Sequence, residues 1–414
     1  MSKKLSVIIS TFIIAVIACS CSQSDRIERD TSLKSLLVGD YSFTVGYDDP
    51  LCLSSSSNIA ASENGYYFTD MNFHYLYYFD KTSKRTVPVC NMPNCTHDDE
   101  NCNAYIDDIR HHPGLWYFDG HIYLVGKKDG VMGLYRINKD GTDHTRSCDF
   151  ASIGPQSTLT LTVHRGYAYF SVEEQDENDK IFRVKLDDNS KPEVVYETPN
   201  KDEAIHDIRG YGDRLILYSY RYDKETDTNK HKLSYYDFSS ENVTDITPDG
   251  FTYAIYAIAE NCIIYNSACN VLKYDAEKDE VSVFYDKGCC DISYDGNYVY
   301  LDNITGILNE VADEFDFSNR VIKVMDLSGN QIDEIPADTK DLNMSYFGDK
   351  DYLLLDFTKK YDAPINRTIE QGNKLQVLTA DSMTVLSAYD KSQIGTDKHE
   401  WIVLKEWDID SIVG

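Results

Sequence analysis

Four potential metal-binding side chains lie within thirteen residues, in the segment from Cys90 to Cys102. The segment reads Cys90-Asn-Met-Pro-Asn-Cys95-Thr-His97-Asp-Asp-Glu-Asn-Cys102. Three thiols and one imidazole are the donor set of a closed, tetrahedral structural zinc site. Although the spacing differs from that of the standard zinc fingers, this composition predicts a structural zinc ion as one of two interpretations.

The other interpretation is disulfide bonding, which is natural for a protein outside the cytoplasm. Cys52 precedes the first predicted strand at the same end of the first repeat, so it could complete two pairs with Cys90, Cys95 and Cys102. Four cysteines allow three connectivities, and the sequence does not choose among them. We place disulfide bonding ahead of a metal, and both ahead of a catalytic thiol, since no third group that would orient His97 as a base is identifiable.

The elements that position this segment are repeated along the chain. Seven short aromatic and aliphatic strands, each opening just after a turn, occur about 47 residues apart. They occupy residues 64–69, 119–125, 165–170, 212–218, 261–265, 295–301 and 349–355. A strand precedes each turn, and a third and a fourth strand follow. Four-stranded repeats of this length, without a helical period, are typical of β-propellers.

We therefore predict an all-β fold, a single seven-bladed β-propeller over residues 37–414. Six or eight blades are the alternatives, because Leu37–Tyr47 and Glu400–Trp407 are both strand-like. These two segments either close the first and seventh blades or pair as a partial eighth blade. In the seventh repeat we expect the third strand at Leu375–Asp381 and the fourth at Thr384–Ala388.

The first 18 residues have the pattern of a secretion signal and are excluded from the fold. Lys3 and Lys4 precede an apolar run, Leu5–Ala18, which is shorter than the roughly 20 residues of an ordinary membrane span. The run ends in Val-Ile-Ala-Cys19, which resembles the lipobox of bacterial lipoproteins. The resemblance implies lipid attachment at Cys19 and an extracytoplasmic position on the bacterial cell envelope. Residues 19–36 would then form a flexible tether; simple secretion is the alternative.

The overall charge restricts the partners. The net charge is −29, which argues against nucleic acid and against an electrostatic hold on anionic lipids. We therefore expect contact with the membrane through the N-terminal lipid alone.

Long links between the second and third strands indicate a binding face. In a propeller these links share one face with the links between blades, and insertions gathered on one face are typical of a binding surface. The extended links are Glu173–Lys180, Tyr220–His231, Asp302–Arg320 and Asp356–Lys374. We expect a protein, peptide or glycan ligand on this long-loop face.

The sequence favours binding over catalysis. It contains neither a Gly-x-Ser-x-Gly elbow nor a His-Glu-x-x-His zinc helix. Our leading prediction is a non-catalytic interaction module without a certain cofactor. The alternative is a polysaccharide-active hydrolase or lyase that uses carboxylates from Asp302–Arg320 and Asp356–Lys374, because paired carboxylates perform glycoside hydrolysis.

Two motifs resemble a family of lipoproteins from anaerobic bacteria. Cys90–Tyr105 fits the signature Cys-x4-Cys-x-His-x4-Cys-Asn-Ala-Tyr, and Leu134–Asp143 is similar to DUF5050 and TolB-like propeller repeats. The resemblance covers Cys19 and about residues 50–390. It implies the propeller fold and the envelope location, and it brings no established substrate.

Overall fold

A computed structural model of the chain describes fourteen stretches of the sequence. They are residues 43–48, 58–69, 74–106, 114–128, 131–150, 159–172, 177–186, 191–252, 255–267, 270–289, 291–303, 321–337, 345–371 and 374–407. The predicted signal peptide, Cys19, the tether, Cys52 and most of Asp302–Arg320 lie outside these residues. No helix among the described stretches has the length and hydrophobicity that a membrane span requires.

The described residues form seven antiparallel sheets of four consecutive strands, which we number 1 to 7 in chain order. Sheet 1 contains β1 (Ile59–Ser62), β2 (Gly65–Thr69), β3 (Leu76–Asp80) and β4 (Arg85–Pro88). Sheet 2 contains β5 (Leu115–Phe118), β6 (His121–Lys128), β7 (Val131–Asn138) and β8 (Thr145–Asp149). Sheet 3 contains β9 (Leu159–His164), β10 (Tyr167–Val172), β11 (Lys180–Lys185) and β12 (Glu193–Glu197).

The remaining sheets repeat this order. Sheet 4 contains β13 (Glu203–Tyr211), β14 (Arg214–Asp223), β15 (Thr228–Asp237) and β16 (Asn242–Asp245). Sheet 5 contains β17 (Tyr256–Ala259), β18 (Cys262–Asn266), β19 (Val271–Asp275) and β20 (Glu280–Tyr285). Sheet 6 contains β21 (Ile292–Tyr294), β22 (Val299–Asn303), β23 (Val321–Met325) and β24 (Gln331–Pro336). Sheet 7 contains β25 (Ser345–Gly348), β26 (Tyr352–Gln371), β27 (Lys374–Asp390) and β28 (Trp401–Trp407).

Tight turns join the first two strands of several sheets. In sheet 2 the register pairs Phe118 with His121, and the two residues between them, Asp119 and Gly120, have φ values of 45° and 77°. Positive φ at both central residues is what a type I′ hairpin turn needs, and Asp-Gly adopts it readily. The predicted hairpins are therefore confirmed. The seven predicted aromatic strands are the second strands of the seven sheets.

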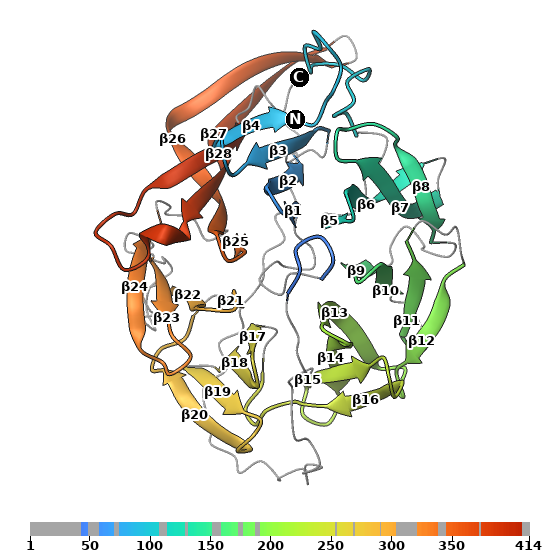
Figure 1. The fold of residues 1–414 in the computed structure, drawn as a ribbon, viewed down its shortest axis with the longest axis vertical. Coiled ribbons are helices and arrows are strands. Elements are labelled where there is room, and N and C mark those ends of the chain that lie inside the picture. The colour runs from blue at the N-terminus through green and yellow to red at the C-terminus, as the bar shows by residue number, and fades with distance from the viewer. Residues whose placement is uncertain are drawn as a thin grey trace, which may run out of the picture. The chain divides into compact units, whose positions relative to one another are not determined.

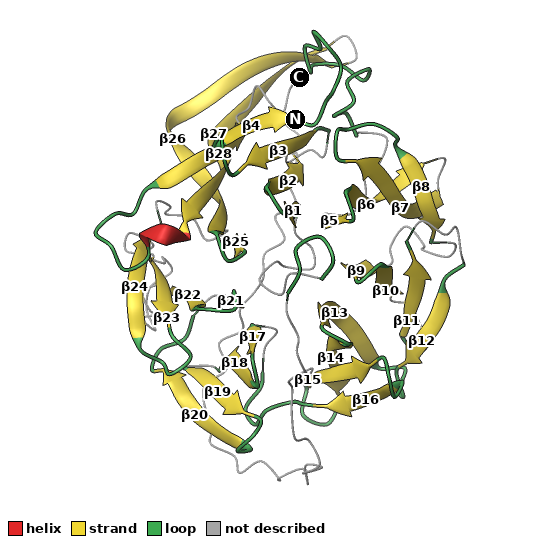
Figure 2. Cartoon of the chain, viewed as in Figure 1, coloured by secondary structure: helices red, strands yellow, loops and turns green. Residues whose placement is uncertain are grey.

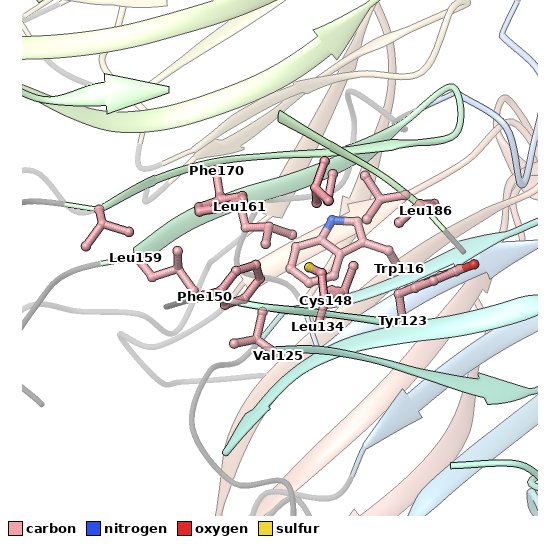
Figure 3. Close-up of a cluster of buried hydrophobic side chains, with 14 residues drawn as sticks. Trp116, Tyr123, Val125, Leu134, Cys148, Phe150, Leu159, Leu161, Phe170 and Leu186 are labelled. Carbon is pink, nitrogen blue, oxygen red and sulfur yellow. The ribbon is translucent and has the colours of Figure 1, made fainter. Parts of the chain in front are cut away.

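The hydrophobic core lies between neighbouring sheets. Adjacent residues of an inner strand pack in opposite directions: Leu115 joins a buried cluster with sheet 1, and Trp116 joins one with sheet 3. Figure 3 shows the second cluster, in which Trp116 lies among side chains of sheets 2 and 3 such as Phe170. Both faces of an inner strand are thus covered, so even polar side chains on these strands, such as Thr160 and Thr162 of β9, are buried.

The inter-sheet contacts close into a circle. Buried clusters join sheets 1 and 2, 2 and 3, 3 and 4, 5 and 6, 6 and 7, and 7 and 1. Tyr218 of sheet 4 completes the circle by packing on Phe251 and Tyr256 at sheet 5. Within the unit Lys34–Gly414 the first strand of each sheet is innermost (Figure 1). The predicted all-β, propeller-type fold is confirmed.

Buried ion pairs reinforce two of these contacts. Lys81 of sheet 1 lies 2.7 Å from Asp349 of sheet 7. Lys391, in the short 3-10 helix η2 (Lys391–Gln393), lies 2.6 Å from Asp295 of sheet 6, and their side chains are only 6% and 1% exposed. η2 is the one helix drawn among the described residues in Figure 2. The last sheet is therefore fixed by charge to both of its neighbours.

The ends of the domain differ from the prediction in part. Glu400–Trp407 closes the seventh sheet, because β28 pairs with β27. The described part of Leu37–Tyr47 is wrong as a strand: Phe43–Asp48 forms a turn closed by the Thr44 carbonyl, which accepts the Asp48 N–H at 2.9 Å. This turn contacts four sheets: Val45 packs on sheets 1 and 7, Gly46 accepts the Asp119 N–H of sheet 2, and Arg165 of sheet 3 donates to Asp48 at 2.6 Å. It therefore caps the hairpin turns of the inner strands.

The seventh sheet also corrects the predicted strand boundaries. The predicted third and fourth strands, Leu375–Asp381 and Thr384–Ala388, belong to one strand, β27. The predicted loop Asp356–Lys374 consists mostly of strand, because β26 runs from Tyr352 to Gln371 and pairs with β27 along its length, apart from an irregularity after Lys360. Tyr220–His231 is likewise the end of a long hairpin.

Burial of Asp356 in β26 predicts a pH-dependent stability. Desolvation raises the pKa of this carboxyl to about 6 from its ordinary 3.8. Because the folded pKa is higher than the unfolded one, stability is lost as the pH rises from about 4 to about 6, by roughly 3 kcal/mol. We expect Asp356→Asn to be more stable than the wild type at pH 7.5 and equally stable near pH 4.

Urea unfolding between pH 4 and pH 8 measures this difference. Asp362→Asn, at an exposed site on the same strand, is the matched control and should not show the gain in stability at pH 7.5. A destabilising effect of Asp356→Asn at pH 7.5 would contradict the account.

Candidate metal centre

Consecutive turns in the link from β4 to β5 gather the candidate donors. The N–H of Cys95 donates to the carbonyl of Met92 at 3.4 Å, and the N–H of Cys102 donates to that of Asp99 at 3.2 Å. The first turn has Pro93 and Asn94 at its centre, and Asn94 has a φ of 59°. Proline presets φ at the first central position and asparagine tolerates positive φ at the second. The chain therefore reverses between Cys90 and Cys95, which brings their side chains together.

His97 adopts a backbone conformation that is uncommon for a residue with a side chain. Its φ is 60°, in the left-handed region that non-glycine residues seldom occupy. Such conformations tend to occur where the surrounding structure requires a particular side-chain direction. In this loop the consequence is that Nδ1 of His97 lies 3.3 Å from Sγ of Cys102.

The Cys-Asn-Ala-Tyr part of the motif fixes the loop to sheet 1. Tyr105 forms a β-bridge with Tyr75, and the carbonyl of Ala104 accepts the N–H of Leu76 at 2.8 Å. Ala104 is completely buried, so no larger side chain fits there without rearrangement. The N–H of Ala104 also donates a hydrogen bond to Sγ of Cys102 at 3.4 Å. This segment thus holds Cys102 in place against the start of β3.

The turn between β7 and β8 supports the loop from sheet 2. Nε2 of His144 lies 3.0 Å from the carbonyl oxygen of Asn103, and Asn91 donates to Asp140 at 3.0 Å. Gly141 has a φ of 84°, and a Cβ added there would lie 1.9 Å from the carbonyl oxygen of Val89. The two motifs that resemble the lipoprotein family, Cys90–Tyr105 and Leu134–Asp143, are therefore in contact.

The four donors meet in one place. The ligand atoms of Cys90, Cys95, His97 and Cys102 all lie within 4.8 Å of one another. A tetrahedral ion with Zn–S bonds of about 2.3 Å separates its sulfur ligands by about 3.8 Å, so small side-chain shifts suffice to bring them onto one ion. Cys102 is buried and the other three are half-buried. The cluster could therefore hold a metal ion.

The thiols differ in how readily they lose a proton. Burial raises the pKa of the Cys102 thiol to about 12. For Cys90, burial acts in the same direction, but the backbone N–H groups of Met92 and Asn103 and the neighbouring thiols outweigh it and lower the pKa. Because metal binding requires thiolates, loading this site would release protons. The affinity for the metal ion should therefore fall as the pH is lowered.

The four residues that the sequence prediction grouped do lie together, but the residues that support them were not predicted. Cys90, Cys95 and Cys102 have free thiols in the structure. Disulfide bonding in the cell stays a prediction, as does pairing with Cys52, which lies outside the described residues. The supporting residues Asn91, Asp140, Gly141 and His144 were not predicted. Among these, only Asp140-Gly141 gave a sequence signal. It indicated a turn, but not that the turn contacts the cysteine loop.

Gly141 offers a test of the support from sheet 2. We expect Gly141→Ala to destabilise the chain by about 2 kcal/mol and to weaken metal binding, because the new Cβ displaces the backbone before Cys90. Gly120→Ala is the matched control, since Gly120 also has a positive φ, 77°, but no atom within 4 Å of an added Cβ. Thermal unfolding with and without zinc measures both effects. Equal losses in the two variants would mean that only backbone strain matters.

Comparisons with known proteins add a fold-level likeness. No protein-family model matches the sequence, and no curated protein matches it. Among solved structures, one from a study of two prolyl endopeptidases has a TM-score of 0.46 and 11% sequence identity. The match covers 81% of this chain and 53% of that chain. A puromycin hydrolase mutant has a TM-score of 0.45 and 12% sequence identity, and the match covers 85% of this chain and 52% of that chain. This chain thus spans about half the length of both. A TolB-like protein from Agrobacterium tumefaciens has a TM-score of 0.33 and 14% sequence identity, and the match covers 52% of this chain and 77% of that chain.

Proposed function

We propose that the chain is a lipid-anchored, extracytoplasmic binding module, in which the seven sheets are the blades of one seven-bladed propeller. The observation that carries the binding role is that two hairpins, β14–β15 and β26–β27, extend beyond the other strands of their sheets. β26 and β27 contain 20 and 17 residues, whereas their counterparts in sheet 1, β2 and β3, contain five each. Such extensions add surface without contributing to the inter-blade core, as expected for a ligand-binding face.

A structural zinc ion is the second part of the proposal. Cys90, Cys95, His97 and Cys102 would supply four protein ligands, which fill a tetrahedral ion and leave no position for a substrate. The ion would therefore fix the link between sheets 1 and 2, where the Cys-Asn-Ala-Tyr segment and the β7–β8 turn already converge. N–H groups near the sulfur atoms of Cys90 and Cys102 are the outer contacts that orient such ligands.

The positions of two carboxylates favour binding over the hydrolase or lyase alternative. Leu301 packs between sheets 5 and 6, so strand alternation directs Asp302 toward sheet 7. Leu355 packs toward sheet 6, so Asp356 faces sheet 1. Catalytic carboxylates of a glycosidase lie across one sugar from each other, at roughly 5 to 10 Å. The two described carboxylates at the starts of these predicted loops face different spaces.

The anchor and the non-catalytic role need separate tests. Full-length wild type should sediment with membranes of the expressing bacterium, whereas Cys19→Ser should lose lipid and leave the membrane fraction. Wild type solubilised in detergent should release no new reducing ends from soluble polysaccharides. Sedimentation of Cys19→Ser with membranes would overturn the anchor at this residue, and released reducing ends would overturn the binding role in favour of an enzyme.

A further inference from the structure

The hairpin of β14 and β15 projects beyond the rest of sheet 4. β13 pairs with β14 only as far as Arg221, opposite Glu203. β16 pairs with β15 only along Ser234–Asp237. The hairpin itself continues to the pair Asp223 and Thr228, so its outer part is a two-stranded ribbon.

One face of the β14–β15 hairpin is aromatic, from the part covered by β13 out to the two-stranded ribbon. Tyr218, Tyr220 and Tyr222 alternate along β14 and therefore lie on the same face, about 6.7 Å apart. His231 of β15 pairs directly with Tyr220. A register shift after Ile205 places His206 as an extra residue in β13, beside the same face. β-Bulges commonly redirect one side chain next to a functional site.

The rings of this face contact one another. The ring centroid of His206 lies 5.8 Å from that of Tyr218 and 6.0 Å from that of Tyr220. His231 lies 5.9 Å from Tyr218, nearly parallel to it, and 6.5 Å from Tyr220. The hydroxyl of Tyr218 also lies 2.6 Å from Nδ1 of His231. Contacts of this kind limit side-chain motion, so the face is largely preformed.

The aromatic face passes from the core to solvent. Tyr218 is buried against Phe251 and Tyr256, Tyr220 is half-buried, and Tyr222 is 47% exposed. His206 is exposed. A row of rings that starts in the inter-sheet core and ends in solvent provides a firmly supported platform with an accessible end.

The charges are distributed unequally between the two faces of the ribbon. Arg221, Lys230 and Lys232 alternate with the aromatic residues and so lie on the opposite face. On the aromatic side, Asp207 is neutralised by Arg209 at 2.6 Å. At the exposed end, the hydroxyl of Tyr222 donates to the carboxylate of Asp227. The aromatic face therefore presents flat rings and hydrogen-bonding hydroxyl and imidazole groups, with one carboxylate at its outer edge.

We propose that the accessible part of this face, His206, Tyr220, Tyr222 and His231, binds a neutral glycan, with the buried Tyr218 as its support. The apolar C–H face of a sugar ring stacks on a tyrosine ring, and its hydroxyl groups pair with imidazole and phenol. An acidic polysaccharide would be repelled by a chain of net charge −29, whereas a neutral one would not. The inference rests on the proposed binding role, which it deepens by naming the ligand class and the site.

Affinity electrophoresis of the detergent-solubilised full-length chain tests the inference. The probes are soluble neutral polysaccharides (laminarin, hydroxyethylcellulose, galactomannan and starch), with polygalacturonate as the acidic comparison. We expect at least one neutral polymer to retard the wild type and polygalacturonate to have no effect. Tyr222→Ala should bind about tenfold more weakly, as expected for loss of one stacked ring, and Tyr222→Phe should bind normally. Arg221→Ala, an exposed site on the opposite face of the same strand, is the matched control.

The outcomes separate this inference from the proposed function. No retardation by any neutral polymer, or equal retardation of wild type and Tyr222→Ala, would overturn the inference. In the second case the chain would still be a binding module with its site elsewhere, for example on the β26–β27 hairpin. Retardation that depends on Tyr222 but is accompanied by new reducing ends would support the glycan site and overturn the non-catalytic role.

Discussion

The Cys102→Ser variant should retain less than about a tenth of the zinc that the wild-type chain carries. Cys102 is the buried donor of the cluster, and serine is a poor zinc ligand. An ion that binds only the folded state stabilises it by about 4 kcal/mol at a thousandfold excess over its dissociation constant. We therefore expect the melting temperature to fall as well. Elemental analysis together with differential scanning calorimetry measures both quantities.

The control for this prediction is Cys262→Ser. Cys262 is a half-buried cysteine of β18 that is not part of the donor cluster. It should keep the wild-type zinc content. If Cys102→Ser and Cys262→Ser retain equal amounts of zinc, the metal is held elsewhere or adventitiously, and the proposed centre is wrong.

Removing the cation of the buried pair between sheets 6 and 7 should produce the second large effect. Lys391→Met would leave the carboxylate of Asp295, whose side chain is 1% exposed, buried without its partner. Loss of one member of a buried ion pair costs about 3 to 5 kcal/mol. The double variant Asp295→Asn/Lys391→Met should recover most of this loss, because no unpaired charge remains.

The pH dependence of this effect has a definite sign. Burial alone would raise the pKa of Asp295, but the adjacent ammonium of Lys391 outweighs it and lowers the pKa. In the wild type the carboxylate therefore contributes stability above its unfolded pKa, and this contribution is lost as the pH falls through the folded pKa. In Lys391→Met the hydrogen bonds from Tyr298 and Tyr300 remain, but the charge that most strongly opposes burial is gone, so the deficit should shrink as the pH is lowered. A deficit in urea unfolding that stays constant between pH 4 and pH 8 would contradict this account.

Much of the fold follows from the sequence because local signals are repeated. Most second strands begin after a turn with a residue of positive φ, as at Asp119-Gly120, and continue with residues that are buried on both faces. One such hairpin is weak evidence, but seven at regular spacing predict four-stranded sheets. The nearly complete burial of β9 and β10 reflects the contact of both faces with neighbouring sheets.

The seventh sheet was harder to predict for a physical reason. The outer part of β26 is mostly exposed, so it has no alternation of apolar and polar residues to distinguish strand from loop. Its pairing with β27 is also interrupted after Lys360. In Leu37–Tyr47 the error is the reverse, because apolar residues were interpreted as a strand. Val45 is apolar because it packs on sheets 1 and 7, although it lies in a turn.

The donors of the candidate metal centre could be predicted because they lie close together in the sequence. Their supports could not, because contacts such as that between His144 and Asn103 join residues 41 positions apart. This contact joins the β4–β5 link to the β7–β8 turn of the next sheet, a proximity that no local pattern encodes. The choice between zinc and disulfide bonds likewise depends on the redox conditions and not on spacing alone.

Native mass spectrometry of the full-length chain, purified without oxygen and released from detergent, tests the central claim most directly. The account predicts one zinc ion per chain, removed by a chelator and restored by added zinc, with all three thiols of the cluster reduced in the metal-free state. A metal-free chain whose mass is lower by two hydrogens for each bond among Cys90, Cys95 and Cys102, or to Cys52, would contradict it. The link between sheets 1 and 2 would then be held by disulfide bonds.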